Sequence, residues 1–156
     1  MRRKDKEVTD KGVIESIIQR SSVCRLALSD DNHPYVIPVC FGYSNNNLYF
    51  HSAPEGKKIN ILEKNNAVCF EFDIDHEIVA ADNPCNWTMK YRSVVGFGKA
   101  SIIEGAREKR DALAIIMQQY SDKSVLDQET NMDHLVVFKV NIDSITGRVS
   151  VYRQET

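Results

Sequence analysis

The fold is decided by residues 24–52, which read CRLALSDDNHPYVIPVCFGYSNNNLYFHS. Cys24–Leu28 has the period of two that is typical of a half-buried strand. Tyr35–Phe41 and Leu48–Ser52 are rich in β-branched and aromatic residues and are predicted as two further strands. Short runs of Asp, Asn and Ser between them indicate tight turns. Because turns alone join the three strands, we expect an antiparallel meander.

Pro38 stands inside the second of these strands. Proline has no N–H group to donate to a neighbouring strand, so within sheets it is confined to edge strands and bulges. The strand that contains Pro38 is therefore predicted to lie at an edge, at a bulge or at a rim that faces a ligand.

The rest of the chain is predicted to supply three helices and four further strands. Helices are expected where apolar residues recur with a helical period, and strands where they alternate. Gly96 and Gly98, within one long strand, permit a sharp bend or a bulge. The predicted helices are Thr9–Arg20, Gly56–Lys64 and Arg107–Tyr120, and the predicted strands are Ala67–Ile74, Arg92–Ile103, Leu135–Ile142 and Ile145–Val149.

These elements predict a mainly β protein, a small antiparallel barrel of about six strands with about three peripheral helices. A doubly wound parallel sheet is excluded, because parallel strands need a crossover and the first three strands here are joined only by turns. No internal repeat or flexible linker divides the chain, so residues 1–156 are expected to form one domain. Within it, residues 1–22 are predicted as an N-terminal arm and helix, and residues 23–150 as the barrel with its inserted helices.

The composition excludes several classes of function. The chain has 20 basic and 22 acidic side chains and a formal net charge of -2, so it lacks the positive field with which proteins bind nucleic acid. Its apolar runs are far shorter than the roughly 20 residues that cross a bilayer, and no apolar stretch follows the basic N-terminus. We therefore expect a cytoplasmic protein with neither a nucleic-acid partner nor a membrane partner.

Residues 48–62 end a predicted strand and begin a predicted helix, with Lys57 and Lys58 in the first turn of that helix. A helix N-terminus carries partial positive charge and unpaired N–H groups, which suit a phosphate or another anion. Lysine is mildly unfavourable at that end of a helix on its own, so the pair indicates an anionic ligand. The alternative is that these are ordinary solvated lysines and that His51 is a packed or hydrogen-bonded histidine.

Motifs for metal and nucleotide binding are absent from the sequence. Cys24, Cys40 and Cys69 lie within apolar runs and are predicted to be buried thiols, whereas Cys85 lies in a loop-like stretch. No Cys-x-x-Cys pair occurs and the histidines are scattered, so no metal site is expected. The dinucleotide-binding glycine motif, the P-loop and Gly-x-Ser-x-Gly are also missing. A prosthetic group that carries a phosphate remains as the ligand to consider.

Several short motifs occur in a fixed order along the chain: Arg2-Arg-Lys-Asp-Lys6, Cys24-Arg-Leu-Ala-Leu28, Pro34-Tyr-Val-Ile-Pro-Val39 with Phe41-Gly-Tyr43, Leu48-Tyr-Phe-His-Ser52, Glu55-Gly-Lys-Lys58 and Tyr91-Arg-Ser-Val-Val-Gly-Phe-Gly98. Together they resemble the nitroimidazole-resistance (Nim) group within the pyridoxamine 5'-phosphate oxidase-like, FMN-binding split-barrel superfamily. The resemblance runs from residue 2 to Ile145-Thr-Gly147 and so covers nearly the whole chain. Any one motif would be weak, but the ordered set is specific and agrees with the barrel predicted above.

The resemblance implies a homodimer with two FMN molecules bound at the subunit interface. The residues implied to bind the cofactor are Ile37, Pro38, Val39 and Cys40 through main-chain groups along the flavin, His51, Ser52, Lys57 and Lys58 at the ribityl phosphate, and Arg92 and Ser93 as polar contacts from the same subunit or the other. The phosphate carries about two negative charges, which two lysines and a helix N-terminus would offset. The alternative for Arg92 is an ion pair at a strand edge.

The chain also departs from the family. Gly56 stands where the oxidases have an arginine, just before the basic position that Lys57 matches, which bears on the strength of binding and the choice of flavin. Val149–Thr156 lacks the segment with Trp and Arg that closes the vitamin site of the oxidases. Cys85 and Trp87 are implied to line a substrate pocket near the flavin. The alternative is that Trp87 packs in the core and Cys85 is merely exposed.

The resemblance favours an FMN-dependent oxidoreductase that reduces small molecules, such as nitroimidazoles or other nitro or quinone-like acceptors, with electrons from a reduced nicotinamide. The first alternative is a non-catalytic protein that binds flavin or haem. Pyridoxamine 5'-phosphate oxidation is the second, and the different C-terminus disfavours it. FMN is the expected cofactor, with FAD or haem as alternatives. No residue is assigned a catalytic role, because the cofactor would carry the chemistry.

Overall fold

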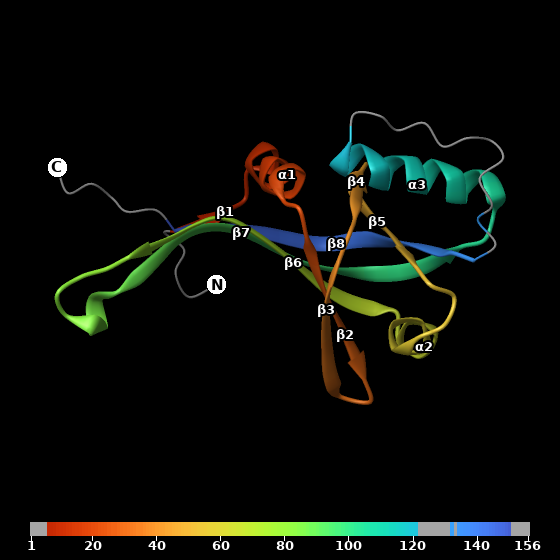
Figure 1. Cartoon of the computed structure of the whole chain (residues 1–156), viewed down its shortest axis with the longest axis horizontal. Helices are drawn as coiled ribbons and strands as arrows, with labels where there is room; N and C mark the ends of the chain where they lie inside the picture. Colours follow the sequence, from red (N-terminus) through yellow and green to blue (C-terminus); the bar gives the residue numbers. More distant parts are fainter. Residues whose placement is uncertain (1–5, 122–131, 133, 151–156) are drawn as a thin grey trace.

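The computed structural model describes residues 6–121, 132 and 134–150, and shows one antiparallel sheet with three α-helices around it (Figure 1). The arm of residues 1–5 and residues 151–156 of the C-terminal segment lie outside the described residues. The helices are α1 (Lys11–Arg20), α2 (Lys57–Lys64) and α3 (Ala106–Tyr120), and Pro84–Asn86 form a short 3₁₀ turn. The strands are β1 (Glu7–Val8), β2 (Cys24–Asp30), β3 (His33–Val39), β4 (Gly42–Ser44), β5 (Asn47–Ser52), β6 (Ala67–Val79), β7 (Thr88–Ile103) and β8 (Val136–Ser150).

The sheet has the order β3-β2-β6-β7-β8-β5-β4, and β1 pairs with β8. The predicted meander is wrong in its last step. β3 forms a hairpin with β2, but β5 pairs with β4 and β8 instead of with β3. The sequence pattern missed this because periodicity gives the faces of a strand and not its neighbours. The chain leaves β3 at Val39, two residues before the predicted end, and then begins the short strand β4 that was not predicted.

The predicted mainly β split barrel with three helices is confirmed, and β1 and β4 are short strands that were not predicted. β3 and β4 follow one another in the chain but lie at the two ends of the strand order, so the sheet is open between them. Its inner face holds the core, in which five phenylalanines are fully buried: Phe41, Phe50, Phe70, Phe72 and Phe138.

The glycines of β7 lie where the sheet is most crowded. A Cβ at Gly96 would overlap the ring of Phe70, and one at Gly98 would overlap the backbone of Asn141. The predicted bulge occurs between Phe97 and Gly98, where the register with β8 shifts. The extra residue is Asp143 of β8, so the two strands predicted at the C-terminal end are one bulged strand.

β6 and β7 continue past the rest of the sheet as a hairpin arm, which we define as residues 75–91 (Figure 1). Its tip is held by its own contacts: Asn83 caps the 3₁₀ turn, and Trp87 Nε1 donates to the carbonyl of Ala81 at 2.8 Å. The alternative interpretation, that Trp87 packs in the core, is wrong, because 55% of this side chain is exposed. Ile78 and Met89 on the same arm are exposed too.

The cysteines differ in burial. Cys24 is buried and Cys69 is partly buried, but Cys40 is exposed, so its predicted burial is wrong. Cys40 lies on the link from β3 to β4, outside the alternation of either strand. Cys85, at the tip of the arm, is exposed. Within the described ranges, no helix has the length and apolar character needed to cross a membrane.

Candidate functional site

The outer edge of β3 is the first part of the candidate site. Among the described residues, β3 pairs with β2 alone, so its other edge has no strand beside it. Asp31 and Asn32 connect β2 to β3 and have φ values of 48° and 67°. Two positive φ values in a two-residue connection define a type I′ turn, and Asp30 and His33 form the pair that closes it.

The turn fixes which backbone groups of β3 face outward. The pair that closes a two-residue hairpin turn is hydrogen-bonded, and bonded and non-bonded pairs then alternate along the ladder. Pro34, Val36 and Pro38 pair with β2 at the non-bonded positions, so their backbone groups point away from it. Since proline has no N–H, this edge offers three carbonyl groups and only one N–H, that of Val36. A further strand that paired with this edge would lack two hydrogen bonds, because Pro34 and Pro38 have no N–H to donate. A small ligand could still bind the three carbonyl groups and the N–H of Val36.

The start of α2 lies beside this edge. Gly56 is its N-cap with φ 139° and no side-chain hydrogen bond, so the first N–H groups are not capped by a side chain. Lys57 Nζ lies 4.9 Å from the centroid of the Tyr35 ring on β3. Lys58 Nζ lies 6.0 Å from the centroid of the Phe138 ring on β8. The helix start, with its two lysines, is thereby placed between the edge strand and the middle of the sheet.

His51 and Ser52 end β5 and complete this cluster. Burial and the positive charge of Lys58 lower the pKa of His51, and burial lowers the pKa of Lys58. Within the part of the chain that the structure describes, His51, Lys57 and Lys58 form no ion pair with a carboxylate. A bound anion would raise both lowered pKa values, because an opposite charge favours the protonated form. The cluster is therefore suited to a phosphate.

The structure does not bring the other predicted site residues to this cluster. Arg92 and Ser93 lie near the start of β7, and Cys85 and Trp87 lie on the hairpin arm. The other end of β7, Ile103, is the end that is joined through β8 to His51. Arg92 is about 11 residues from Ile103, or roughly 35 Å along an extended strand. Within one chain, the two sets of predicted residues are therefore far apart.

Arg92 also has a partner of its own, since its Nε lies 3.1 Å from Asp75 Oδ2. The ion pair of the alternative interpretation is thus present in the single chain. Its placement at a strand edge is wrong, because Arg92 pairs with Ile74 of β6 on one side and with Val149 of β8 on the other. Asp75 stands at a bulge of β6 with φ 58°, and it also contacts Arg20 of α1 at 2.6 Å.

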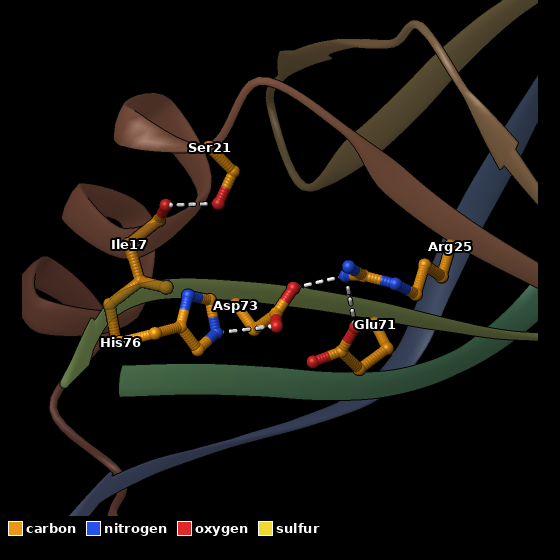
Figure 2. Close-up of polar contacts among 6 residues, drawn as sticks. All are labelled: Ile17, Ser21, Arg25, Glu71, Asp73 and His76. Atoms are coloured by element: carbon orange, nitrogen blue, oxygen red, sulfur yellow. Dashed lines mark hydrogen bonds and ion pairs between the residues drawn. The ribbon is translucent and has the colours of Figure 1, made fainter. Parts of the chain in front are cut away.

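A second polar cluster lies on the outer face of β2 and β6, and sequence reasoning missed it. Arg25 binds both Glu71 and Asp73, and His76 contacts Asp73 (Figure 2). The distance from His76 Nε2 to Asp73 Oδ2 is 2.6 Å. Beside it, Ser21 Oγ donates to the carbonyl of Ile17 at the end of α1. Burial and the charge of Asp73 raise the pKa of Glu71. Acids and bases pair with one another here, so the cluster ties β2 to β6.

Pro34, Tyr35 and Val36 are residues of β3 at the candidate site that sequence reasoning did not single out. The spacing of Pro34 and Pro38 was the available signal, because two prolines four residues apart in a strand must share one edge.

No residues in the described ranges form a group of three or more His, Cys, Asp or Glu that could hold a metal ion.

Comparison with known proteins places the chain among relatives. A family profile described as pyridoxamine 5'-phosphate oxidase matches residues 10–149. An uncharacterised protein of Rhizobium meliloti (strain 1021) is 32% identical over 146 residues, which cover 87% of this chain and 89% of that protein. Among solved structures, a candidate 5-nitroimidazole antibiotic resistance protein of Bacteroides thetaiotaomicron is 40% identical, with a TM-score of 0.82 over 92% of this chain and 86% of that one. The FAD- and haem-binding protein of Mycobacterium smegmatis has the same fold, with a TM-score of 0.85 at 17% identity over 97% of this chain and 76% of that one.

We expect the pKa of His51 to rise when Lys58→Met removes the neighbouring positive charge, since protonation of the imidazole then becomes easier. An NMR titration of the His51 ring measures this as a midpoint at higher pH. Lys64→Met, at the far end of α2, is the control and should leave the midpoint unchanged. A midpoint that stays the same in Lys58→Met would show that Lys58 does not act on His51.

Proposed function

This chain belongs to the pyridoxamine 5'-phosphate oxidase family, and from that membership we propose that it is a cytoplasmic flavoprotein that binds FMN and reduces small nitro or quinone-like compounds with a reduced nicotinamide. The observation that carries the proposal is the group of basic residues His51, Lys57 and Lys58, which has no carboxylate partner among the described residues and lies beside an open strand edge. The relative from Bacteroides thetaiotaomicron supports the choice of nitro compounds as acceptors.

The residues present fit the phosphate end of FMN. Lys57 and Lys58 would bind the phosphate together with the N–H groups at the start of α2, which no side chain caps. Protonated His51 would add a further positive charge, and because the pKa of His51 is lowered in the free protein, binding of an anion would favour uptake of a proton by this ring. Ser52 would offer a hydroxyl from the end of β5.

The edge of β3 fits the ring end of the cofactor. The carbonyl groups of Pro34, Val36 and Pro38 accept hydrogen bonds, and the N–H of Val36 donates one, so the edge can orient a flat polar heterocycle. Ile37 and Val39 pair with Leu26 and Cys24 at the bonded positions of the ladder, so their main-chain groups face β2 and cannot make the contacts that the resemblance implies for them. Pro38 keeps its carbonyl on the outer edge, and Cys40 follows the end of the strand. A bound flavin supplies the electron transfer, and the protein supplies its binding, its orientation and the exclusion of water.

A second copy of the chain accounts for the residues that lie far from this cluster. A barrel of this size fills its interior with side chains, so a flavin must lie on its outside and needs a cover. The hairpin arm of a partner, with Trp87, Ile78 and Met89 exposed on it, has the apolar character of such a cover. Two-fold symmetry is the commonest arrangement of two identical chains. We therefore propose a homodimer in which Arg92, Ser93, Cys85 and Trp87 reach the flavin of the other subunit.

A non-catalytic flavin or haem protein is the second candidate. Flavocytochrome Anf3 of Azotobacter vinelandii and the FAD- and haem-binding protein of Mycobacterium smegmatis each share the fold with a TM-score of 0.85, at 17% identity. A haem would give a Soret band, whereas a flavin would give a yellow protein. The visible spectrum of the purified protein therefore distinguishes a haem protein from a flavoprotein. If the protein holds a flavin, oxidation of a reduced nicotinamide distinguishes the oxidoreductase from a non-catalytic flavin protein.

The function is tested by releasing and identifying the cofactor and then assaying the loaded protein. We expect denaturation to release FMN, and the FMN-loaded protein to oxidise a reduced nicotinamide faster when a nitroimidazole or a quinone is present. Free FMN at the same concentration is the control. Release of haem, or FMN without any turnover above that control across nitro and quinone acceptors, would contradict the proposed oxidoreductase.

Replacing both Lys57 and Lys58 with alanine should leave the fold intact and weaken FMN binding. Each charge-assisted hydrogen bond is worth about 1.5–3 kcal/mol, so the loss of two predicts a dissociation constant more than roughly a hundredfold higher. Titration of the apoprotein with FMN, followed by flavin fluorescence, measures the effect. Lys64→Ala is the matched control on the same helix, and equal affinities in the double variant and the wild type would exclude the phosphate site.

The holoprotein should be a dimer with an interface of the obligate size, about 2,000 Å² or more in total. Because each flavin site would need both chains, dilution that dissociates the dimer should also release FMN. Light scattering gives the mass, and fluorescence gives the bound fraction of flavin over the same dilution series. A monomer mass with one FMN bound to each chain would overturn the two-subunit site.

A further inference from the structure

The two halves of the candidate site lack a direct connection through the sheet. β3 carries the ring edge, while β5 and the start of α2 carry the cations. β3 and β4 are joined by Cys40 and Phe41 but lie at opposite ends of the strand order. The shortest path of strand pairing from β3 to β5 therefore passes through β2, β6, β7 and β8. A contact other than strand pairing is therefore needed to hold β3 in position relative to β4 and β5.

Tyr120, the last residue of α3, makes that contact. Its hydroxyl accepts the N–H of Phe41 at 3.1 Å and donates to the carbonyl of Ser22 at 3.1 Å. Phe41 begins the chain's path away from β3, and Ser22 precedes β2, the strand to which β3 is paired. One hydroxyl thus bonds both to the segment that enters β2 and to the segment that leaves β3, at the open end of the hairpin. The rings of Tyr120 and Phe41 also pack edge to face, with centroids 6.2 Å apart.

Neighbouring contacts fix α3 itself in place. Gln119 Nε2 donates to the carbonyls of Gln19 and Ser21 at 2.9 Å each, which ties the end of α3 to the end of α1. Gly42, the first residue of β4, lies so close to α3 that a Cβ there would be 2.7 Å from the carbonyl carbon of Ile115. The helix is therefore held against β4 at one point and against the β2–β3 hairpin at another.

We propose that Tyr120 is a positioning residue for the flavin site: it fixes the β2–β3 hairpin relative to β4 and β5, and so sets the place of the ring edge relative to His51 and α2. This inference rests on the proposed function. Phe41 is fully buried, so water cannot readily replace the hydroxyl as the partner of its N–H. A tyrosine hydroxyl is protonated and able to donate at physiological pH. Tyr120 is 44% exposed as a whole residue, and partial burial, the largest cause, raises its pKa further, to about 12.

The test compares Tyr120→Phe with Tyr43→Phe. Tyr43 is a matched control, because its hydroxyl donates to Glu15 Oε1 at 2.9 Å and its pKa is also raised to about 12, but its hydroxyl forms no hydrogen bond with the described residues of the β2–β3 hairpin. We expect Tyr120→Phe to fold, to bind FMN about tenfold or more weakly and to shift the visible spectrum of the bound flavin. Tyr43→Phe should keep the wild-type spectrum and stay within about twofold in affinity. A wild-type spectrum and affinity in Tyr120→Phe, or equal changes in both variants, would overturn the proposal.

Amide hydrogen exchange of the apoprotein supplies a readout that does not depend on the flavin. Exchange over residues 34–41 should be faster in Tyr120→Phe than in the wild type, and unchanged in Tyr43→Phe. If the wild type binds no flavin, the proposed function fails and the positioning role fails with it, but faster exchange in Tyr120→Phe would still show that Tyr120 holds the hairpin.

Gln119→Ala is the second variant, to be used should Tyr120→Phe not fold. It removes the adjacent hydrogen bonds, and it should raise exchange over residues 34–41 and weaken FMN binding. The absence of both effects in Gln119→Ala would then overturn the proposal.

Discussion

The structure depends on one strand edge that the sheet cannot close. At the edge of β3, Pro34 and Pro38 remove two of the three N–H groups that another strand would need, and the chain then crosses to the far end of the sheet as β4. The barrel is therefore split, and backbone carbonyls remain free on a surface where a ligand can reach them. α2 brings positive charge close to Tyr35 of β3, and α3 brings the hydroxyl of Tyr120, which ties the hairpin in place.

The charges of the molecule are distributed in two different ways. Arg20, Arg25 and Arg92 each lie against carboxylates, so the outer face of β2 and β6 and the base of the hairpin arm are electrostatically satisfied. Lys57 and Lys58 lie against aromatic rings instead, and Lys58 is partly buried, which lowers its pKa. Cations that are crowded and half-buried without a counter-charge cost stability in the free protein. An anionic cofactor would remove that cost, which is the physical reason to place the phosphate here.

Local features of the fold and the site were predictable from the sequence, and long-range ones were not. Apolar periodicity located the helices and most strands, Pro38 indicated an edge, and Lys57 and Lys58 marked a helix start that suits an anion. The opposite placement of β3 and β4 escaped prediction because strand pairing joins residues that are distant in sequence. The exposure of Trp87 and of Cys40 also depends on long-range arrangement. Trp87 lies on the hairpin arm that projects from the sheet, and Cys40 lies on the link from β3 to β4. The bonds of Tyr120 to Phe41 and Ser22 link a side chain to distant backbone, and such bonds leave no period in the sequence.

The central claim is that the open edge of β3 and the start of α2 together form the flavin site. Hydrogen exchange followed by mass spectrometry, with and without saturating FMN, tests it most directly, because it reports where the backbone becomes protected. The account predicts slower exchange with FMN in two peptides, one covering residues 34–41 and one covering residues 52–60. FMN binding that protects other segments while both of these exchange at the rates of the free protein would contradict it.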